Sequence, residues 1–186
     1  MKVAVLGKIA SGKSEVMSIL RKKGFFCIYS DKIVRELYKS GKQGAELIKK
    51  YFGPDYLFED GEVDRVKLRN IVFEEPNKLK MLNKIIHPLV YAEIIKILKS
   101  AKGANVAIEL SYLVDDRLKK NIDKLIWIDR NVRLIEKTLL TERKFSKDLA
   151  KKTLRLIKKP IYVNFVIKND GDLAYLDFLV SKLLAM

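Results

Sequence analysis

The residues with the clearest chemical meaning form a glycine-rich segment near the start of the chain. They are Gly7-Lys8-Ile9-Ala10-Ser11-Gly12-Lys13-Ser14, which match the P-loop pattern G-x-x-x-x-G-K-[ST] at every fixed position. In such a loop the backbone amides surround phosphate oxygens, Lys13 contacts the β- and γ-phosphates, and the Ser14 hydroxyl ligates Mg²⁺. The segment therefore predicts binding of ATP with Mg²⁺.

The flanking residues predict the elements that such a loop requires. Residues 1–6 are apolar and indicate a strand, and Val16, Ile19 and Leu20 follow at the spacing of a helix that ends at Gly24. A second apolar strand is predicted over 25–29 and a helix over 32–39. Strand, loop and helix then alternate as in a parallel α/β sheet.

Asp31 follows the second predicted strand directly. Ligands of open parallel sheets bind beyond the carboxyl ends of the strands, so a carboxylate here could take the proton of an acceptor hydroxyl. Ser30 and Asp31 could equally serve only as a helix cap. Position alone does not decide between the two roles.

The remaining sequence predicts one α/β domain over 1–186, a three-layer P-loop fold with a five-stranded parallel sheet. Residues 41–101 are mostly helical in pattern and are interpreted as an insertion beside the sheet, in which Pro88 can open a helix. Further strands are predicted at 105–110, 124–128 and 162–167, and helices at 114–120, at 131–141 and at the end of the chain. Residues 142–159 form a basic stretch without a strand pattern.

Composition limits the classes of function. The chain has 186 residues, and 38 basic against 23 acidic residues give a net charge of +15, which favours anionic partners such as nucleotides, nucleic acid or acidic membranes. No apolar run is long enough to span a membrane and the N-terminus does not resemble a signal peptide, so a cytoplasmic protein is expected. One cysteine (Cys27, expected to be a small buried hydrophobe) and one histidine (His87) exclude disulfides within the chain and metal sites built from several thiolates or imidazoles.

Several motifs in order resemble those of dephospho-CoA kinases over roughly residues 1–180. The loop resembles the family's G-G-I-G-S-G-K-S, and Tyr29-Ser30-Asp31-Lys32-Ile33-Val34-Arg35 resembles D-A-D-x-I-A-R. The later matches are Tyr51-Phe52-Gly53, Gly61-Glu62-Val63-Asp64-Arg65 with Leu68, Val72-Phe73, Ile86-His87-Pro88 and Ile167-Lys168-Asn169-Asp170-Gly171. The combination is specific, although no single later motif is.

The resemblance implies ATP-dependent phosphorylation of the ribose 3′-hydroxyl of dephospho-CoA, the final step of CoA biosynthesis. It implies that Asp31 is the general base, and that residues 41–101 bind the acceptor and residues 142–159 form a lid. Asn169 and Gly171 would lie beside adenine, and Glu109 would hold Mg²⁺ through water. Arg35, Asp64, Arg65 and His87 would bind the acceptor, although a purely structural His87 remains open.

The chain departs from the family pattern at several positions. Tyr29 and Ser30 replace the first acidic residue and the alanine of D-A-D. The family's D-x-P-L-L-x-E segment reads Glu109 to Asp115, with Ser111 in place of proline. The lid is short, with Ile157 near the expected glutamine; Arg143 and Arg155 remain, beside Lys137, Lys144 and Lys158. Arg143 is the predicted catalytic arginine of the lid.

Three alternatives remain open from sequence. Another small-molecule P-loop kinase, such as a nucleoside monophosphate kinase, would share the fold. A basic nucleic-acid-binding protein would explain the net charge, but most aromatic residues fall in apolar runs instead of among basic ones. A family member that binds nucleotide without turnover would explain the altered segments. We expect a small-molecule partner, no nucleic acid, no membrane, and a monomer or small homo-oligomer.

Overall fold

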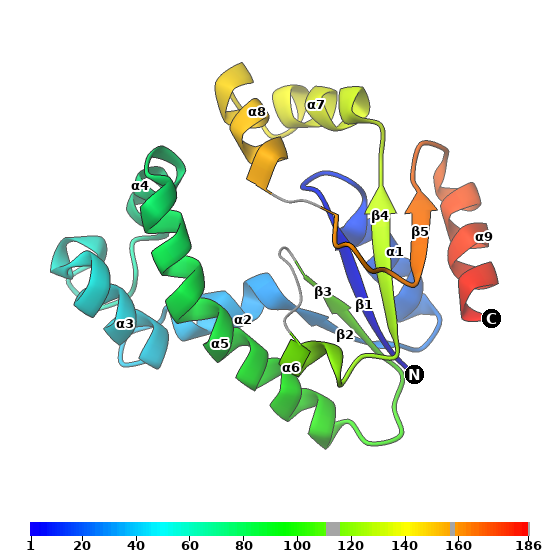
Figure 1. The fold of residues 1–186 in the computed structure, drawn as a ribbon, viewed down its shortest axis with the longest axis horizontal. Helices are drawn as coiled ribbons and strands as arrows, with labels where there is room; N and C mark the ends of the chain where they lie inside the picture. Colours follow the sequence, from blue (N-terminus) through cyan, green and yellow to red (C-terminus); the bar gives the residue numbers. More distant parts are fainter. Residues whose placement is uncertain (111–115, 157–158, 186) are drawn as a thin grey trace. The chain divides into compact units, whose positions relative to one another are not determined.

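The computed structural model describes residues 1–110, 116–156 and 159–185. Ser111, Asp115, Ile157 and Lys158, which the sequence analysis singled out, lie outside the described residues. The chain divides into two compact units (Figure 1). We call residues 1–29 with 98–186 the sheet unit and residues 30–97 the helical unit, and we describe each by itself.

The sheet unit contains a five-stranded parallel sheet, which confirms the predicted fold class. Its strands have the spatial order β2-β3-β1-β4-β5. They are β1 (Lys2–Gly7), β2 (Phe26–Tyr29), β3 (Val106–Glu109), β4 (Lys124–Asp129) and β5 (Phe165–Lys168). β5 begins three residues later than predicted, because the Asn164 side chain accepts the hydrogen bond of Leu125 N–H where the ladder starts.

The central strand β1 carries the phosphate-binding loop at its carboxyl end. Val5 of β1 pairs with Glu109 of β3, and Gly7 pairs with Ile128 of β4. The strands are parallel, so the residues that follow β1, β3 and β4 emerge at the same edge of the sheet. This edge is where the sequence predicts the chemistry.

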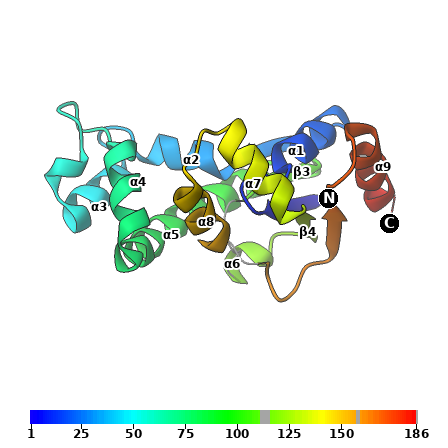
Figure 2. The same cartoon turned by 90° about the horizontal axis from the view of Figure 1, so that it is seen from above.

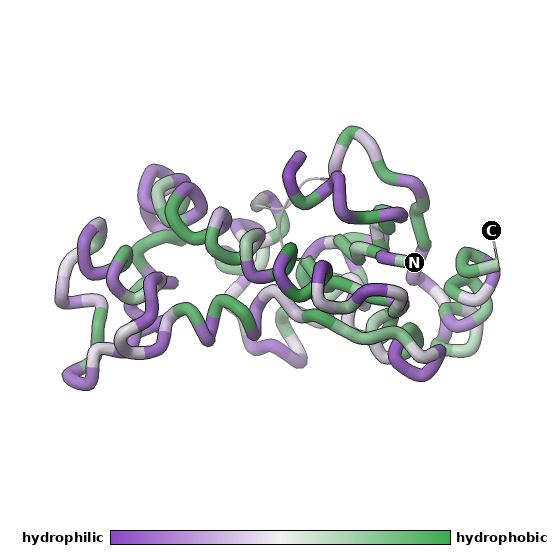
Figure 3. Tube along the Cα trace, turned by 90° about the horizontal axis from the view of Figure 1, so that it is seen from below, coloured by the Kyte–Doolittle hydropathy of each residue, from purple (hydrophilic) through white to green (hydrophobic). Residues whose placement is uncertain are grey.

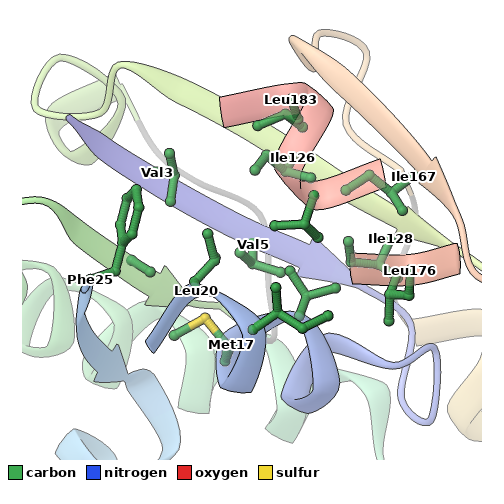
Figure 4. Close-up of a cluster of buried hydrophobic side chains, with 14 residues drawn as sticks. Val3, Val5, Met17, Leu20, Phe25, Ile126, Ile128, Ile167, Leu176 and Leu183 are labelled. Atoms are coloured by element: carbon green, nitrogen blue, oxygen red, sulfur yellow. The ribbon is translucent and has the colours of Figure 1, made fainter. Parts of the chain in front are cut away.

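The helices of the sheet unit lie on both faces of the sheet and at its carboxyl edge. They are α1 (Lys13–Lys22), α6 (Asp116–Lys119), α7 (Val132–Thr141), α8 (Lys147–Leu156) and α9 (Leu173–Leu184), and α7 and α8 lie at the carboxyl edge (Figure 1). α1 and α9 lie on one face and α6 on the other (Figure 2). Between the sheet and the α1–α9 face, fully buried apolar side chains form the core, among them Val3, Val5, Met17, Ile126 and Leu176 (Figure 4). This packing fixes where α1 begins, and therefore the geometry of the loop.

The helical unit has its own buried side chains. Its elements are α2 (Ser30–Leu37), α3 (Gln43–Phe52), a 3₁₀ turn (Pro54–Tyr56), α4 (Arg65–Glu74) and most of α5 (Pro76–Ser100). Ile48, Leu68 and Ile86 are at most 3% exposed. Hydrophilic and hydrophobic residues mix along these helices (Figure 3), as expected where each helix buries one side only.

Two boundaries in the helical unit differ from the sequence predictions. Pro88 lies inside α5, so the prediction that it opens a helix was wrong. Proline removes only its own N–H bond from the helix ladder, and the buried neighbours Ile86, Val90 and Ile94 hold the helix together across it. α2 begins at Ser30, directly after β2, two residues earlier than predicted. In the described parts of the chain no helix is long and apolar enough to cross a membrane.

Candidate active site

The first glycine of the phosphate-binding loop is required by close packing. Gly7 is the last residue of β1 and pairs with Ile128. A Cβ atom on Gly7 would lie 2.5 Å from Ser11 Oγ and 2.7 Å from the Ile128 carbonyl oxygen, too close for any side chain. The loop therefore turns directly against the neighbouring strand.

The second glycine is required by both conformation and contact. Gly12 has φ +98°, which residues with a side chain rarely adopt. The carboxamide of Asn169 occupies the space into which a Cβ atom would project. Its Nδ2 donates a hydrogen bond of 2.9 Å to the Ser11 carbonyl. The residue that follows β5 is thus part of the support of the loop.

Lys13 lies against the backbone of the loop. It is the first residue of α1 and is only 7% exposed. Its Nζ donates hydrogen bonds to the carbonyl oxygens of Gly7, at 3.0 Å, and Lys8, at 2.9 Å. Ser14 is exposed in the first turn of the same helix. The helix N-terminus and a lysine ammonium together create a positive potential at the loop, which suits a phosphate group.

Arg130 is a loop contact that the sequence analysis missed. It directly follows β4, and its Nη1 donates a hydrogen bond of 2.9 Å to the Ala10 carbonyl. Ala10 has φ +58°, in the left-handed region, and the family pattern has glycine at this position. A signal existed in the sequence, because a basic residue after the predicted strand 124–128 falls at the carboxyl edge of the sheet.

Glu109 ends β3, next to the strand that carries the loop. It is partly buried. The described residues contain no group of three or more His, Cys, Asp or Glu side chains suited to a metal ion. Magnesium in nucleotide enzymes usually takes one or two protein oxygens and completes its shell with water and phosphate. Ser14 and Glu109 fit that donor set.

Residues 169–171 connect β5 to α9 beside the loop. The backbone N–H of Asn169 donates a hydrogen bond of 2.7 Å to the Asp129 carbonyl. The Asp170 carboxylate accepts a hydrogen bond of 2.7 Å from the backbone N–H of Asn131. Gly171 is exposed just before α9. These bonds join the segments after β4 and β5, so Asn169 reaches Ser11 from a fixed backbone.

α7 and α8 form a helical hairpin that packs on the loop. Ile135, Leu139 and Ala150 form a small buried cluster against which Ile9 and Ala10 pack. Arg143 lies in the exposed connection between the two helices, with its amide bonded to the Thr138 carbonyl at 3.2 Å. Arg155 is exposed on α8. Of the predicted lid 142–159, Ala150 thus belongs to the apolar cluster on which the loop packs.

Asp31, Arg35, Asp64, Arg65 and His87 all belong to the helical unit. Asp31 and Arg35 are exposed one turn apart on α2, a spacing that places both on one side of the helix. Asp31 follows Tyr29, the last residue of β2, by two positions. The structure brings this group into one unit and the residues around the loop into the other.

Asp64 directly precedes α4, and Arg65 is the first residue of that helix. The Asp64 carboxylate caps the helix by accepting 3.0 Å hydrogen bonds from the Val66 and Lys67 amides. Arg65 is exposed beside it. Burial raises the pKa of the nearby Tyr38 to about 12, and the Arg65 charge opposes that rise. The capping role of Asp64 is structural and orients the first turn that carries Arg65.

His87 lies in α5, one residue before Pro88. It is partly buried, and its ring centroid lies 5.9 Å from that of Tyr91, one helical turn later, with the planes at 54°. The ring contact is what packing within one helix provides.

Tyr29 and Cys27 occupy the edge strand β2. The Tyr29 hydroxyl accepts a 2.5 Å hydrogen bond from Arg21 of α1, whose guanidinium carbon lies 5.7 Å from the tyrosine ring centroid. Tyr29, which stands where the family pattern has an acidic residue, thus pairs with a basic side chain. Burial raises the pKa of the partly buried Cys27 thiol, and its Sγ lies 3.5 Å from the Met17 carbonyl oxygen.

The positive charge is concentrated in the sheet unit. This unit has 25 basic and 12 acidic residues, a net +13, whereas the helical unit has 13 and 11, a net +2. Within the sheet unit, residues 130–159 alone contain 11 basic and 3 acidic residues. The excess therefore gathers in the segment that includes Arg130 and the α7–α8 hairpin.

Comparison with known proteins decides the family. A family model described as dephospho-CoA kinase matches residues 1–174. A dephospho-CoA kinase of Aquifex aeolicus is 32% identical over 176 residues, which cover 92% of this chain and 90% of the relative. The chain belongs to the dephospho-CoA kinase family. Membership of that family makes it an enzyme, a phosphotransferase, and does not favour the nucleoside monophosphate kinase or nucleic-acid-binding alternatives.

Solved structures agree with the dephospho-CoA kinase fold. A crystal structure from Thermus thermophilus superposes with a TM-score of 0.78 at 22% identity, covering 98% of this chain and 95% of that chain. A dephospho-CoA kinase from Campylobacter jejuni gives a TM-score of 0.68 at 24% identity, covering 98% and 94%. At these identities the likeness demonstrates the fold, and the family assignment rests on the sequence matches.

Proposed function

We propose that the chain transfers the γ-phosphoryl group of ATP to the ribose 3′-hydroxyl of dephospho-CoA, giving CoA and ADP in the final step of CoA biosynthesis. The observation that carries the proposal is the phosphate-binding loop at the carboxyl end of β1, with Lys13 held on its carbonyls, in a chain of this family. Different residues bind the nucleotide, bind the acceptor and take the proton of the acceptor hydroxyl.

The nucleotide triphosphate binds to residues 7–14. Lys13 exchanges the Gly7 and Lys8 carbonyls for phosphate oxygens, which are stronger acceptors because they are charged. Backbone amides of the loop and the N-terminus of α1 bind the remaining oxygens. Asn169 and Gly171 border the adenine side, where Asn169 also supports Ser11.

Ser14 and Glu109 would hold Mg²⁺, Ser14 directly and Glu109 through water. Bound Mg²⁺ neutralises charge on the β- and γ-phosphates. Glu109 suits this role because β3 pairs with β1, so a carboxylate at the end of β3 belongs to the same edge of the sheet as the loop.

The acceptor is bound by the helical unit in this proposal. Asp31 orients the 3′-hydroxyl and takes its proton as the oxygen attacks the γ-phosphorus in line, and ADP leaves. Arg35 and Arg65 offer exposed guanidinium groups for the phosphates of dephospho-CoA. Asp64 fixes the start of α4, and His87 contributes from α5.

The lid closes over the reacting groups to exclude water. Arg143 stabilises the charge that develops on the transferred phosphoryl group. We assign residues 142–159 to the lid and 41–101 to the acceptor-binding insertion within a single kinase domain of 1–186. We expect a cytoplasmic monomer or small homo-oligomer that acts on a small molecule and not on nucleic acid or membranes.

The test is ADP release with ATP, Mg²⁺ and dephospho-CoA, with AMP, adenosine and no acceptor as comparisons. The proposal is supported if ADP and CoA form when dephospho-CoA is the acceptor and no ADP forms with AMP, with adenosine or without acceptor. Asp31→Asn should lose about 10²- to 10⁴-fold in kcat, the range for a general base, while nucleotide binding stays intact. Glu36→Gln removes another exposed carboxylate of α2 and should leave kcat unchanged. Equal activity on AMP, or full activity of Asp31→Asn, would contradict the proposal.

A further inference from the structure

Ala10 has an unfavourable backbone conformation at the centre of the phosphate-binding loop. Its φ of +58° lies in the left-handed region, where a Cβ atom clashes with the neighbouring carbonyl. The family pattern G-G-I-G-S-G-K-S has glycine at this position, and glycine adopts the region freely. Something in this chain must therefore hold the alanine in place.

The methyl group of Ala10 explains part of the substitution. Ile9 and Ala10 pack against Ile135, Leu139 and Ala150 of the α7–α8 hairpin, so the methyl group adds apolar contact with the hairpin. Apolar contact is not directional, and it does not select one peptide orientation. The orientation needs a hydrogen bond.

Arg130 supplies that hydrogen bond. Its Nη1 donates a hydrogen bond of 2.9 Å to the Ala10 carbonyl. Arg130 directly follows β4, and β4 pairs with β1 as far as Gly7 and Ile128. The guanidinium is partly buried, and its Nε has no hydrogen-bond partner among the described residues. A planar group anchored at the end of a central strand gives a fixed position for the contact.

Asn169 holds the next carbonyl, that of Ser11, at 2.9 Å. Two successive peptide groups are thus fixed from the ends of two neighbouring strands, β4 and β5. In a trans peptide the C=O and N–H point in opposite directions, so fixing the Ser11 carbonyl also fixes the direction of the Gly12 N–H. The same argument applies to the Ala10 carbonyl and the Ser11 N–H, which donates to the Lys8 carbonyl at 3.2 Å.

We propose that Arg130 is a positioning residue for nucleotide binding, which holds Ala10 in the left-handed conformation and so keeps the phosphate-binding loop in its binding shape. The proposal rests on the proposed function, because it assumes that residues 7–14 bind the nucleotide. It differs from a direct electrostatic role in one respect. If Arg130 acts through Ala10, a glycine at position 10 makes Arg130 less necessary.

The experiment compares Arg130→Gln, Arg130→Lys, Ala10→Gly and the double variant Ala10→Gly/Arg130→Gln. ADP binding is measured by calorimetry, and KM for ATP, KM for dephospho-CoA and kcat are measured by ADP release. Arg133→Gln is the matched control, since Arg133 is an exposed arginine three residues later. Thermal denaturation without ligand checks that each variant is folded.

Arg130→Gln should weaken ADP binding and raise KM for ATP about tenfold, as expected for loss of a hydrogen bond from a charged donor, with KM for dephospho-CoA unchanged. Arg130→Lys keeps a charged hydrogen-bond donor, so its ADP affinity and its KM for ATP should stay within about twofold of the wild-type values. Ala10→Gly should recover most of the loss in the double variant, and Arg133→Gln should change ADP binding less than about twofold, as expected for an exposed charge.

Unchanged ADP binding in Arg130→Gln would overturn the role of Arg130 while leaving the proposed function intact. An equal loss in the single and double variants would also overturn it, because the arginine would then act by its charge alone. A wild-type chain that bound neither ADP nor ATP would overturn the proposed function and this role together.

Discussion

Gly12→Ala tests how closely the phosphate-binding loop depends on its second glycine. The substitution puts a methyl group at φ +98°, in the space that the Asn169 carboxamide occupies. Asn169 must then move away and release the Ser11 carbonyl, to which it donates at 2.9 Å. The loop therefore loses a favourable backbone conformation and a supporting hydrogen bond at once.

The magnitude follows from these two contributions. A non-glycine residue in the left-handed region costs about 1–2 kcal/mol. Loss of the Asn169–Ser11 hydrogen bond adds about 1 kcal/mol. The free energy of unfolding should thus fall by about 2–3 kcal/mol. ADP affinity should also fall, by about tenfold for each 1.4 kcal/mol of this change that acts on the loop in its binding shape.

Gly24→Ala is the matched control. Gly24 has φ +86°, so alanine there meets the same conformational penalty, but nothing lies within 4 Å of the added Cβ atom. Its free energy of unfolding should fall by about 1–2 kcal/mol with ADP affinity unchanged. Urea denaturation measures the first quantity and calorimetry the second. Equal stability and equal ADP affinity in the two variants would refute the role assigned to Asn169 and to the space at Gly12.

Three further predictions concern single side chains. Lys13→Met should weaken ADP binding and lower kcat together, because the ammonium of Lys13 is the charge held on the loop; calorimetry and ADP release measure both, and a variant with both intact would contradict the P-loop assignment. Glu109→Gln should raise the Mg²⁺ concentration needed for half-maximal ADP release by about tenfold while ADP binding without Mg²⁺ stays unchanged, since removal of outer ligand support typically costs 10- to 100-fold in metal affinity. The third concerns pH. Burial raises the pKa of Tyr38 to about 12, above the value near 10 of an unfolded tyrosine, so the unfolded chain loses its proton first as pH rises. The stability contributed by the protonated Tyr38 is complete below pH 10 and is lost between pH 10 and 12, by up to about 2–3 kcal/mol. Denaturation curves of the wild type and Tyr38→Phe should diverge over that interval, and parallel curves would show that the hydroxyl is not desolvated.

Local patterns predicted the elements that hold the loop. The apolar run before Gly7 and the spacing of Val16, Ile19 and Leu20 gave β1 and α1 because each depends on residues close in sequence. Asp64, which caps α4, was predicted only as a substrate residue. Its capping role follows from an aspartate placed just before a helix, and that signal was present in the sequence.

Contacts between distant segments could not be predicted in the same way. Arg130 and Ala10 are 120 positions apart, and Asn169 and Ser11 are 158 apart. Both contacts depend on the order β1-β4-β5 in the sheet, which no local pattern specifies. The interior position of Pro88 likewise depends on buried residues on both sides of it, and a propensity rule weighs only the proline itself.

The basic character of residues 130–159 has a consequence for the end of the catalytic cycle. A field that attracts ATP and dephospho-CoA attracts the products equally, because CoA and ADP are also polyanions. We expect this attraction to slow the release of ADP and CoA and to favour product inhibition. Added salt, which screens the field, should raise kcat while it lowers kcat/KM. Steady-state kinetics at low and high ionic strength would therefore show whether binding of substrates or release of products limits the rate.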